Sequence, residues 1–114
     1  MSGNNDVARV AEALNAAVLN SGEYKNYMAA REKISLDTAL AEKLKQFQEK
    51  KMEYNARLAE DGTEDMSAED ELSKMFFDLS LNGDARDFFE AEKMFFSLMT
   101  ETQDKMCEGL EILI

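Results

Sequence analysis

The chain of 114 residues lacks three residue types and is poor in two others. It contains no proline, histidine or tryptophan, one cysteine and five glycines. Without histidine, the commonest general base and metal ligand is missing, which excludes histidine-dependent triads, HExxH zinc sites and Glu-x-x-His di-iron bundles. The lone Cys107 excludes an internal disulfide. The scattered glycines form no phosphate-binding loop.

Long apolar runs and clusters of basic residues are also missing. No stretch approaches the roughly 20 apolar residues of a membrane span, and the N-terminus lacks the pattern of a secretory signal, so we expect a cytoplasmic protein. Acids outnumber bases by 24 to 13, a net charge of −11. Nucleic acids and anionic membranes attract clustered cations. We therefore expect no direct nucleic-acid or membrane contact, while a basic partner protein remains open.

The residues that are present favour helices. Apolar residues make up 45% and charged residues 32% of the chain, which is typical of a soluble globular protein with few helix breakers. The length predicts a single all-α domain over 1–114, with residues 1–5 flexible. About five helices are expected, near 7–20, 23–35, 38–60, 67–81 and 84–111, with an acidic loop at 59–66.

The most informative pattern is an echo at a spacing of 61 residues. Segments 21–30 and 82–91 both read as a small polar residue, a glycine and an acid, followed by a base, an aromatic and an alanine at matching offsets. Each segment follows an amphipathic run, at 7–20 and 68–81. The echo predicts two helix-turn-helix hairpins, joined by the long central helix into an elongated bundle.

Local signals predict where these helices begin and end. Gly22 is expected to take the left-handed conformation that often ends a helix. The predicted N-caps are Asn5 or Asp6, Asp37, Ser67 and Asp84. The central helix carries a seam spaced alternately by four and three residues: Leu40, Leu44, Phe47, Lys51, Tyr54 and Leu58. This seam suits a coiled coil or the inner side of a bundle helix, and its short length favours the bundle.

The last helix carries more apolar residues than one side can hold. Its inner stripe is Phe88, Phe95, Met99, Met106 and Leu113, with Phe89 and Phe96 beside it. Twenty-eight residues give a rod of roughly 42 Å, longer than the diameter of about 35 Å of a compact domain this size. Such a rod needs a partner to cover it, so we predict a homo-oligomer, a two-fold dimer. The interface candidates are Phe77, Phe89, Phe96, Met99 and Met106.

Several features have two interpretations. The Phe and Met residues at 75–77 and 94–99 form either ordinary core or an adaptable docking surface. The acids at 60–71 are either metal ligands or part of a solvated loop that leads into a helix N-terminus. Their spacing does not fit an EF-hand and favours the solvated loop. Cys107 is a ligand or a small semi-buried residue, and one thiolate cannot hold an iron–sulfur cluster. We predict no catalytic residue, metal or cofactor.

Spaced residues along nearly the whole chain resemble a known family. The pattern is Leu14, Ser21-x-Glu23-Tyr24-x-x-Tyr27-x-x-Ala30, Phe47-Gln48 and Leu79-x-Leu81-Asn82-x-x-x-Arg86-x-Phe88-x-x-Ala91-Glu92-x-x-Phe95. It is similar to the YlbF/YmcA/YheA group of small bacterial helical proteins, and most similar to the YheA-type branch. The resemblance implies a cytoplasmic, oligomeric all-α protein. Some members are regulators that assemble with sister proteins to influence competence, sporulation, biofilm formation and messenger-RNA processing by a membrane-anchored ribonuclease.

The chain departs from the regulatory members at its cysteines. Their complex is associated with iron–sulfur clusters, and Cys107 alone cannot supply the ligands, so cluster binding does not carry over. We therefore expect a non-catalytic oligomeric interaction protein, with protein partners and a regulatory role as the resemblance implies. The alternative is a helical bundle that binds a metal or small ligand through carboxylates. An enzyme is kept only as a formal third hypothesis.

Overall fold

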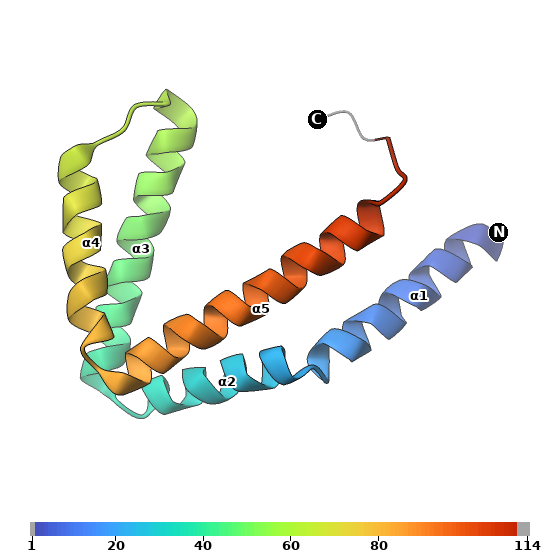
Figure 1. The fold of residues 1–114 in the computed structure, drawn as a ribbon, viewed down its shortest axis with the longest axis horizontal. Coiled ribbons are helices and arrows are strands. Elements are labelled where there is room, and N and C mark those ends of the chain that lie inside the picture. The colour runs from blue at the N-terminus through green and yellow to red at the C-terminus, as the bar shows by residue number, and fades with distance from the viewer. Residues whose placement is uncertain (1, 112–114) are drawn as a thin grey trace. The chain divides into compact units, whose positions relative to one another are not determined.

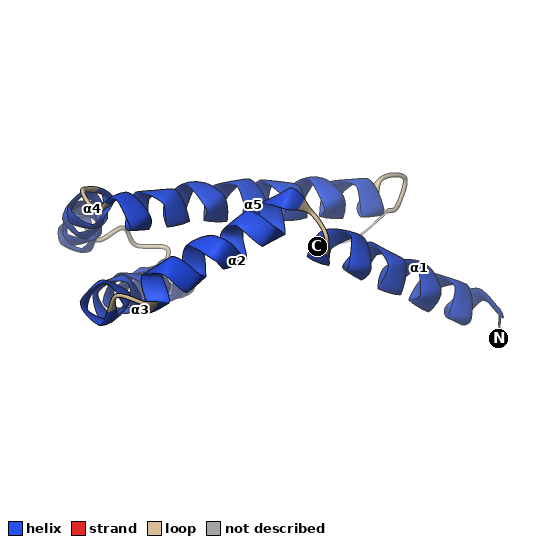
Figure 2. Ribbon diagram, turned by 90° about the horizontal axis from the view of Figure 1, so that it is seen from below, coloured by secondary structure: helices blue, strands red, loops and turns tan. Residues whose placement is uncertain are grey.

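The fold is entirely helical, as the sequence predicts. The computed structural model describes residues 2–111, with side chains from residue 5 onward. Its helices are α1 (Ser2–Leu19), α2 (Gly22–Ser35), α3 (Thr38–Asp61), α4 (Met66–Ser80) and α5 (Gly83–Cys107). Short loops join them, and this part of the chain contains no strand (Figure 2). Five helices in an all-α fold confirm the prediction, while Leu113 of the expected inner stripe lies outside the described residues.

The echo marks two helix starts with equivalent capping side chains. The Ser21 hydroxyl accepts a hydrogen bond from the Tyr24 amide at 3.2 Å and donates one to the Val18 carbonyl at 2.7 Å. In the second copy the Asn82 side-chain oxygen accepts from the amides of Asp84 and Ala85, at 2.9 and 3.1 Å. Both turns therefore start a new helix by satisfying its free amides. Asn82 rather than Asp84 is the N-cap of α5.

Aspartate side chains cap the starts of α3 and α4 in the same way. Asp37 accepts from the Leu40 amide at 3.1 Å, which confirms it as the N-cap of α3. Asp65 accepts from the Ala68 amide at 3.1 Å, so it caps α4 in place of the predicted Ser67. Gly62, at the end of α3, takes the left-handed conformation with φ of 65°. Gly22 has no positive φ, because it is already the first residue of α2.

Some helix ends differ from the predicted positions. Helix α1 begins at Ser2, before the expected caps Asn5 and Asp6. Helix α3 continues to Asp61, so the loop before α4 is shorter than the predicted 59–66. Helix α5 ends at Cys107, and Gly109 follows with φ of 83°. Its 25 residues make a rod of roughly 38 Å.

Contacts divide the chain into two compact units, and the prediction of one domain stays a prediction. Unit 2 spans residues 30–89, and unit 1 combines residues 1–29 with 90–114. The division falls inside α2 and α5. In unit 2, α3 and α4 run antiparallel side by side (Figure 1). The central helix is therefore half of a packed hairpin and not only a connector, because the short loop at Gly62 returns the chain along it.

All of the buried apolar residues in the described part of the chain lie in unit 2. They are Ile34, Leu40, Leu44, Phe47, Tyr54, Leu79, Ala85 and Phe88. Four of them come from the α3 seam, which confirms the interpretation of that seam as the inner side of a packed helix. Unit 2 therefore has a core built from α3 and α4, closed by the end of α2 and the start of α5.

Candidate interaction surfaces

Unit 1 has no comparable core. None of its described side chains, in residues 5–29 and 90–111, is buried. Ten large apolar residues of this unit are exposed instead: Val7, Val10, Leu14, Leu19, Met28, Met94, Phe96, Met99, Met106 and Leu110. Exposed apolar side chains in such number are unusual for a monomer, which makes these residues candidates for an interaction surface.

Three of the predicted interface residues lie on one side of α5 in this unit. Phe96, Met99 and Met106 are 54%, 42% and 62% exposed. Their spacing of three and seven residues puts them on one helix side. The predicted inner stripe is therefore only half right. Phe88 is buried and Phe95 half-buried, whereas Met99 and Met106, further along the helix, have little cover.

Aromatic rings hold α2 against α5 within unit 1. The ring of Phe95 lies 5.3 Å from that of Tyr24 and 5.2 Å from that of Tyr27, measured between centroids. Both tyrosines belong to the first copy of the echo, and all three side chains are half-buried. Aromatic pairs at such distances contribute about 0.5–1.5 kcal/mol each beyond the area they bury. This cluster joins α2 to α5 within unit 1, and Phe96 lies on a different side of α5.

Helix α1 presents a second uncovered apolar surface. Its side chains are exposed from Asn5 to Leu19 with one exception, Val18, which is half-buried. The apolar stripe includes Val7 and Val10, at 71% and 69% exposure. An isolated amphipathic helix of this length is marginal in water and gains most of its stability by packing its apolar side. The stripe of α1 therefore needs a surface to pack on.

The other two interface candidates belong to unit 2 and differ from each other. Phe77 of α4 is 68% exposed. Phe89 is half-buried, with its ring 4.8 Å from Phe76, 5.9 Å from Phe47 and 6.0 Å from Phe88. Phe89 therefore has partial cover from three phenylalanines within the protomer, and its place in an interface stays a prediction.

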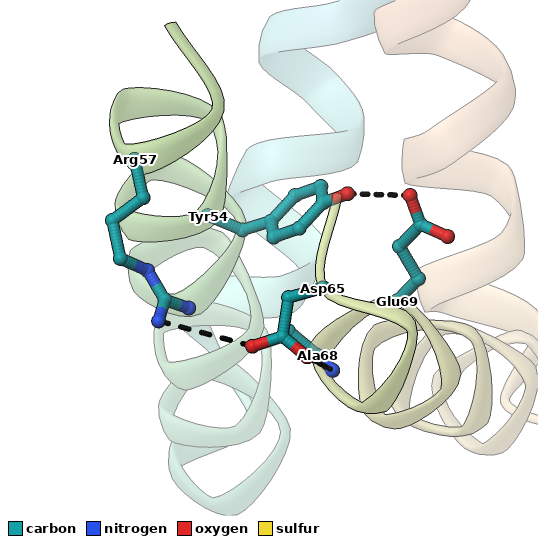
Figure 3. A network of polar contacts seen from close by, with 5 residues as sticks. All are labelled: Tyr54, Arg57, Asp65, Ala68 and Glu69. Carbon is teal, nitrogen blue, oxygen red and sulfur yellow. Dashed lines mark hydrogen bonds and ion pairs between the residues drawn. The ribbon is translucent and has the colours of Figure 1, made fainter. Parts of the chain in front are cut away.

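A polar network fixes the loop end of the α3–α4 pair (Figure 3). The buried Tyr54 of α3 donates a hydrogen bond from its hydroxyl to the carboxylate of Glu69 on α4. The Arg57 guanidinium nitrogen Nη1 lies 4.0 Å from the carboxylate oxygen Oδ2 of Asp65, the capping residue of α4. The hydrogen bond to Glu69, then burial of the phenol and the nearby carboxylate charges, raise the pKa of Tyr54. The tyrosine thus stays protonated and keeps Glu69 in place.

Next to this network lies an open groove of about 480 Å³ between α3 and α4. Apolar residues Phe47, Leu72 and Phe76 form its floor, and Lys51 and Glu69 are its charged lining residues. A second cavity of about 370 Å³ lies near the α2–α3 and α4–α5 turns, lined by Asp37, Lys43 and Asp78 among others.

The described residues offer no metal centre. Among them, no group of three or more cysteine, aspartate or glutamate side chains is placed to hold an ion. The acids at 60–71 serve other purposes there, since Asp65 caps α4, Asp70 pairs with Lys74 at 3.1 Å and Glu71 pairs with Lys50. Cys107 is half-buried in the last turn of α5. The carboxylate-binding alternative therefore gains no support.

Two features were missed at the level of sequence. The pair of Tyr54 and Glu69 is separated by 15 residues, with no motif that links them. The groove depends on α3 and α4 lying antiparallel, and the only signal for that was the short connection after Gly62.

No helix within residues 2–111 is both long and apolar enough to cross a lipid bilayer.

These features define a small all-helical protein in which, over residues 5–111, exposed large apolar residues outnumber buried ones. Comparison with known families is consistent with this class. The chain belongs to the Com_YlbF family, described as control of competence regulator ComK, YlbF/YmcA, whose model matches residues 7–111. The resemblance inferred from spaced residues is thereby confirmed. The family is linked to a regulatory role by that description.

Curated relatives carry the name UPF0342 protein. Relatives from Caldicellulosiruptor bescii and Symbiobacterium thermophilum are each 26% identical, over 108 and 102 residues. One from Caldicellulosiruptor saccharolyticus is 24% identical over 107 residues. These alignments cover 93%, 90% and 94% of this chain and 89%, 91% and 89% of the relatives, in that order. No solved structure gives a significant match.

Proposed function

We propose that this protein is a non-catalytic helical interaction protein that assembles with a second copy of itself through unit 1. One observation carries the proposal: unit 1 exposes ten large apolar residues and buries none of its described side chains. Apolar surface is stabilised at roughly 25 cal/mol for each Å² removed from water. A second copy brings the same surface, and a two-fold axis covers both at once.

The side of α5 that bears Phe96, Met99 and Met106 is the proposed centre of this interface. The stripe of α1 that includes Val7 and Val10 is proposed to pack against it across the dimer. Flexible methionines beside an aromatic ring suit surfaces that must adapt to a partner. Phe77 is proposed to serve a different contact, because it belongs to unit 2.

The biological role follows from family membership as a proposal. The family description concerns control of ComK, so we propose a regulatory adaptor that acts through protein contacts in the bacterial cytoplasm. Developmental control and messenger-RNA processing are the settings that the family resemblance suggests. A carboxylate site for a metal or small ligand is not favoured, since no suitable group of ligands is present among the described residues.

Light scattering coupled to gel filtration, at micromolar protein, tests the assembly. The expected result is a mass of twice 12.9 kDa. Cross-linking between single cysteines placed at Phe96 in a Cys107→Ser background gives a covalent dimer if the two α5 helices meet at this point. A monomer that remains folded at every concentration would refute the proposal.

A further inference from the structure

The groove on the α3–α4 pair is a surface that self-assembly through unit 1 does not use. Its floor consists of Phe47 on α3 and Leu72 and Phe76 on α4. At one end the ring of Phe89 contacts both phenylalanines, so the first turns of α5 cover that end of the floor. The apolar strip then continues, open, toward the α3–α4 loop.

The lining changes character along the groove. Because α3 runs toward the loop and α4 away from it, Tyr54 and Glu69 lie at the loop end (Figure 3). The hydroxyl of Tyr54 holds the Glu69 carboxylate. No cation pairs with Glu69 among the ion pairs of the described residues. The apolar strip therefore ends at a fixed negative charge with no counter-charge.

The surroundings of this end are acidic as well. Residues 57–74 contain seven acids, namely Glu60, Asp61, Glu64, Asp65, Glu69, Asp70 and Glu71, against two bases, Arg57 and Lys74. Ion pairs with Arg57, Lys74 and Lys50 of α3 compensate Asp65, Asp70 and Glu71, and the other four acids are in none of the ion pairs of the described residues. Lys51 is the one cation that lines the groove, and it lies nearer the middle of α3. A ligand that follows the groove thus meets apolar rings first, then a single lysine, then a negative field.

We propose that this groove binds one amphipathic helix from another protein, with its apolar side on the phenylalanine floor and lysine or arginine at the Glu69 end. A groove between two packed helices suits the insertion of a third helix, which buries anchors spaced by three and four residues. Charge complementarity selects a basic helix and speeds its association. Lys51 sets the direction in which the bound helix lies, because its positive charge repels a lysine or arginine at the middle of the groove.

A foreign helix fits better than a second copy of this chain. The chain carries a net charge of −11, so a second copy would bring acids to an acidic rim. The exposed Phe77 lies four residues after Ser73, which lines the groove, and so extends the apolar surface along the same side of α4. The proposal deepens the proposed function by naming a partner class, and it rests on unit 2 alone.

The test measures binding of a synthetic peptide to the full chain. The probe is a helical peptide with leucines at positions i, i+3, i+4 and i+7 and lysines toward one end. Its counterpart carries glutamate in place of each lysine. Isothermal titration gives the dissociation constant of each. We expect saturable binding of the basic peptide and at least roughly tenfold weaker binding of the acidic one.

Variants locate the binding on the groove. Glu69→Gln keeps an oxygen for the Tyr54 hydrogen bond and is expected to weaken binding about two- to fivefold, the range of a single exposed ion pair. Leu72→Glu introduces a charge on the floor and is expected to weaken binding roughly tenfold or more. Lys51→Gln removes the opposing cation and should tighten binding about twofold.

Matched controls carry the same changes of charge elsewhere on α3. Glu42→Gln and Lys45→Gln lie on exposed positions turned away from the groove by the helical repeat, and both should leave the dissociation constant unchanged. Circular dichroism melts verify that each variant is folded. Light scattering on Leu72→Glu should give the same mass as the unmodified protein.

Several results would overturn the groove proposal. Equal binding of both peptides, or equal effects of Glu69→Gln and Glu42→Gln, would mean that only net charge acts. Loss of peptide binding in Phe96→Glu with retention in Leu72→Glu would place the peptide on unit 1. Dissociation of the dimer by Leu72→Glu would make a second copy the occupant.

A monomeric protein that still binds the peptide as described would refute self-assembly but leave the groove proposal standing.

Discussion

Phe96→Glu is expected to separate assembly from folding. Phe96 is 54% exposed in the protomer, and an aromatic side chain presents about 150–250 Å². Covering the exposed half removes roughly 100 Å² from water, worth about 2.5 kcal/mol at about 25 cal/mol per Å². A two-fold interface contains the residue twice, so the substitution costs the dimer about 5 kcal/mol. The dissociation constant should therefore rise on the order of a thousandfold.

Folding of the protomer should change little, because a substitution at an exposed position usually alters the free energy of unfolding by about 0.5 kcal/mol or less. Sedimentation equilibrium measures the dissociation constant, and urea denaturation of the diluted monomer measures folding. The control is Ser97→Glu, which adds the same charge at the next, exposed position on another side of α5. Loss of folding in step with loss of assembly, or an equal effect of Ser97→Glu, would refute the reasoning.

Four further predictions concern single features. Gly62→Ala should destabilise unit 2 by about 1 kcal/mol in urea denaturation, because φ is 65° there. Gly22→Ala, with open space around it and no positive φ, should be neutral or slightly stabilising, so equal losses would contradict this. Asp37→Ala should cost about 1 kcal/mol through loss of the α3 cap, and Thr38→Ala, next to it in the first turn, serves as the exposed control. The raised pKa of Tyr54 favours its protonated form in the folded state, so this stabilisation is complete below the unfolded pKa of about 10 and is lost as pH rises through the folded value. Tyr54→Phe should therefore remove part of the fall in stability above that pH, and an identical alkaline profile would contradict the assignment. EDTA should leave the melting temperature unchanged, since a metal bound to the folded state would raise it.

Local structure could be predicted from the sequence because its causes are local. Asp37 before a helix and the polar-glycine pairs at 21–22 and 82–83 act on amides within three residues. The errors at Ser67 and Asp84 arose because Asp65 and Asn82, each two residues earlier, already cap the first amides of α4 and α5. The starts of α2 to α5 were therefore predicted to within one residue, whereas α1 begins five residues earlier than expected, and two of the predicted capping residues were wrong.

The interaction surfaces depend on which helices pack, and spacing alone does not determine that. Phe89 and Phe96 have the same flank position in the helical repeat of α5, yet one lies among three rings and the other is exposed. The difference arises because α3 and α4 reach Phe89, a contact between residues far apart in the chain. For the same reason the Tyr54 hydrogen bond had no sequence signal, and the groove had only the short connection after Gly62. Met99 and Met106 were expected on the inner stripe but are exposed like Phe96, and a role of the three in an interface stays a prediction.

The uneven burial between the units has a consequence for turnover in the cell. A segment that shelters nothing opens at little cost in free energy, so a solitary copy offers α1 to proteases while its α3–α4 hairpin stays intact. Pairing of two copies would cover α1 and remove this access for proteases. The lifetime of each copy would then depend on how many others are present, and surplus unpaired chains would be cleared first.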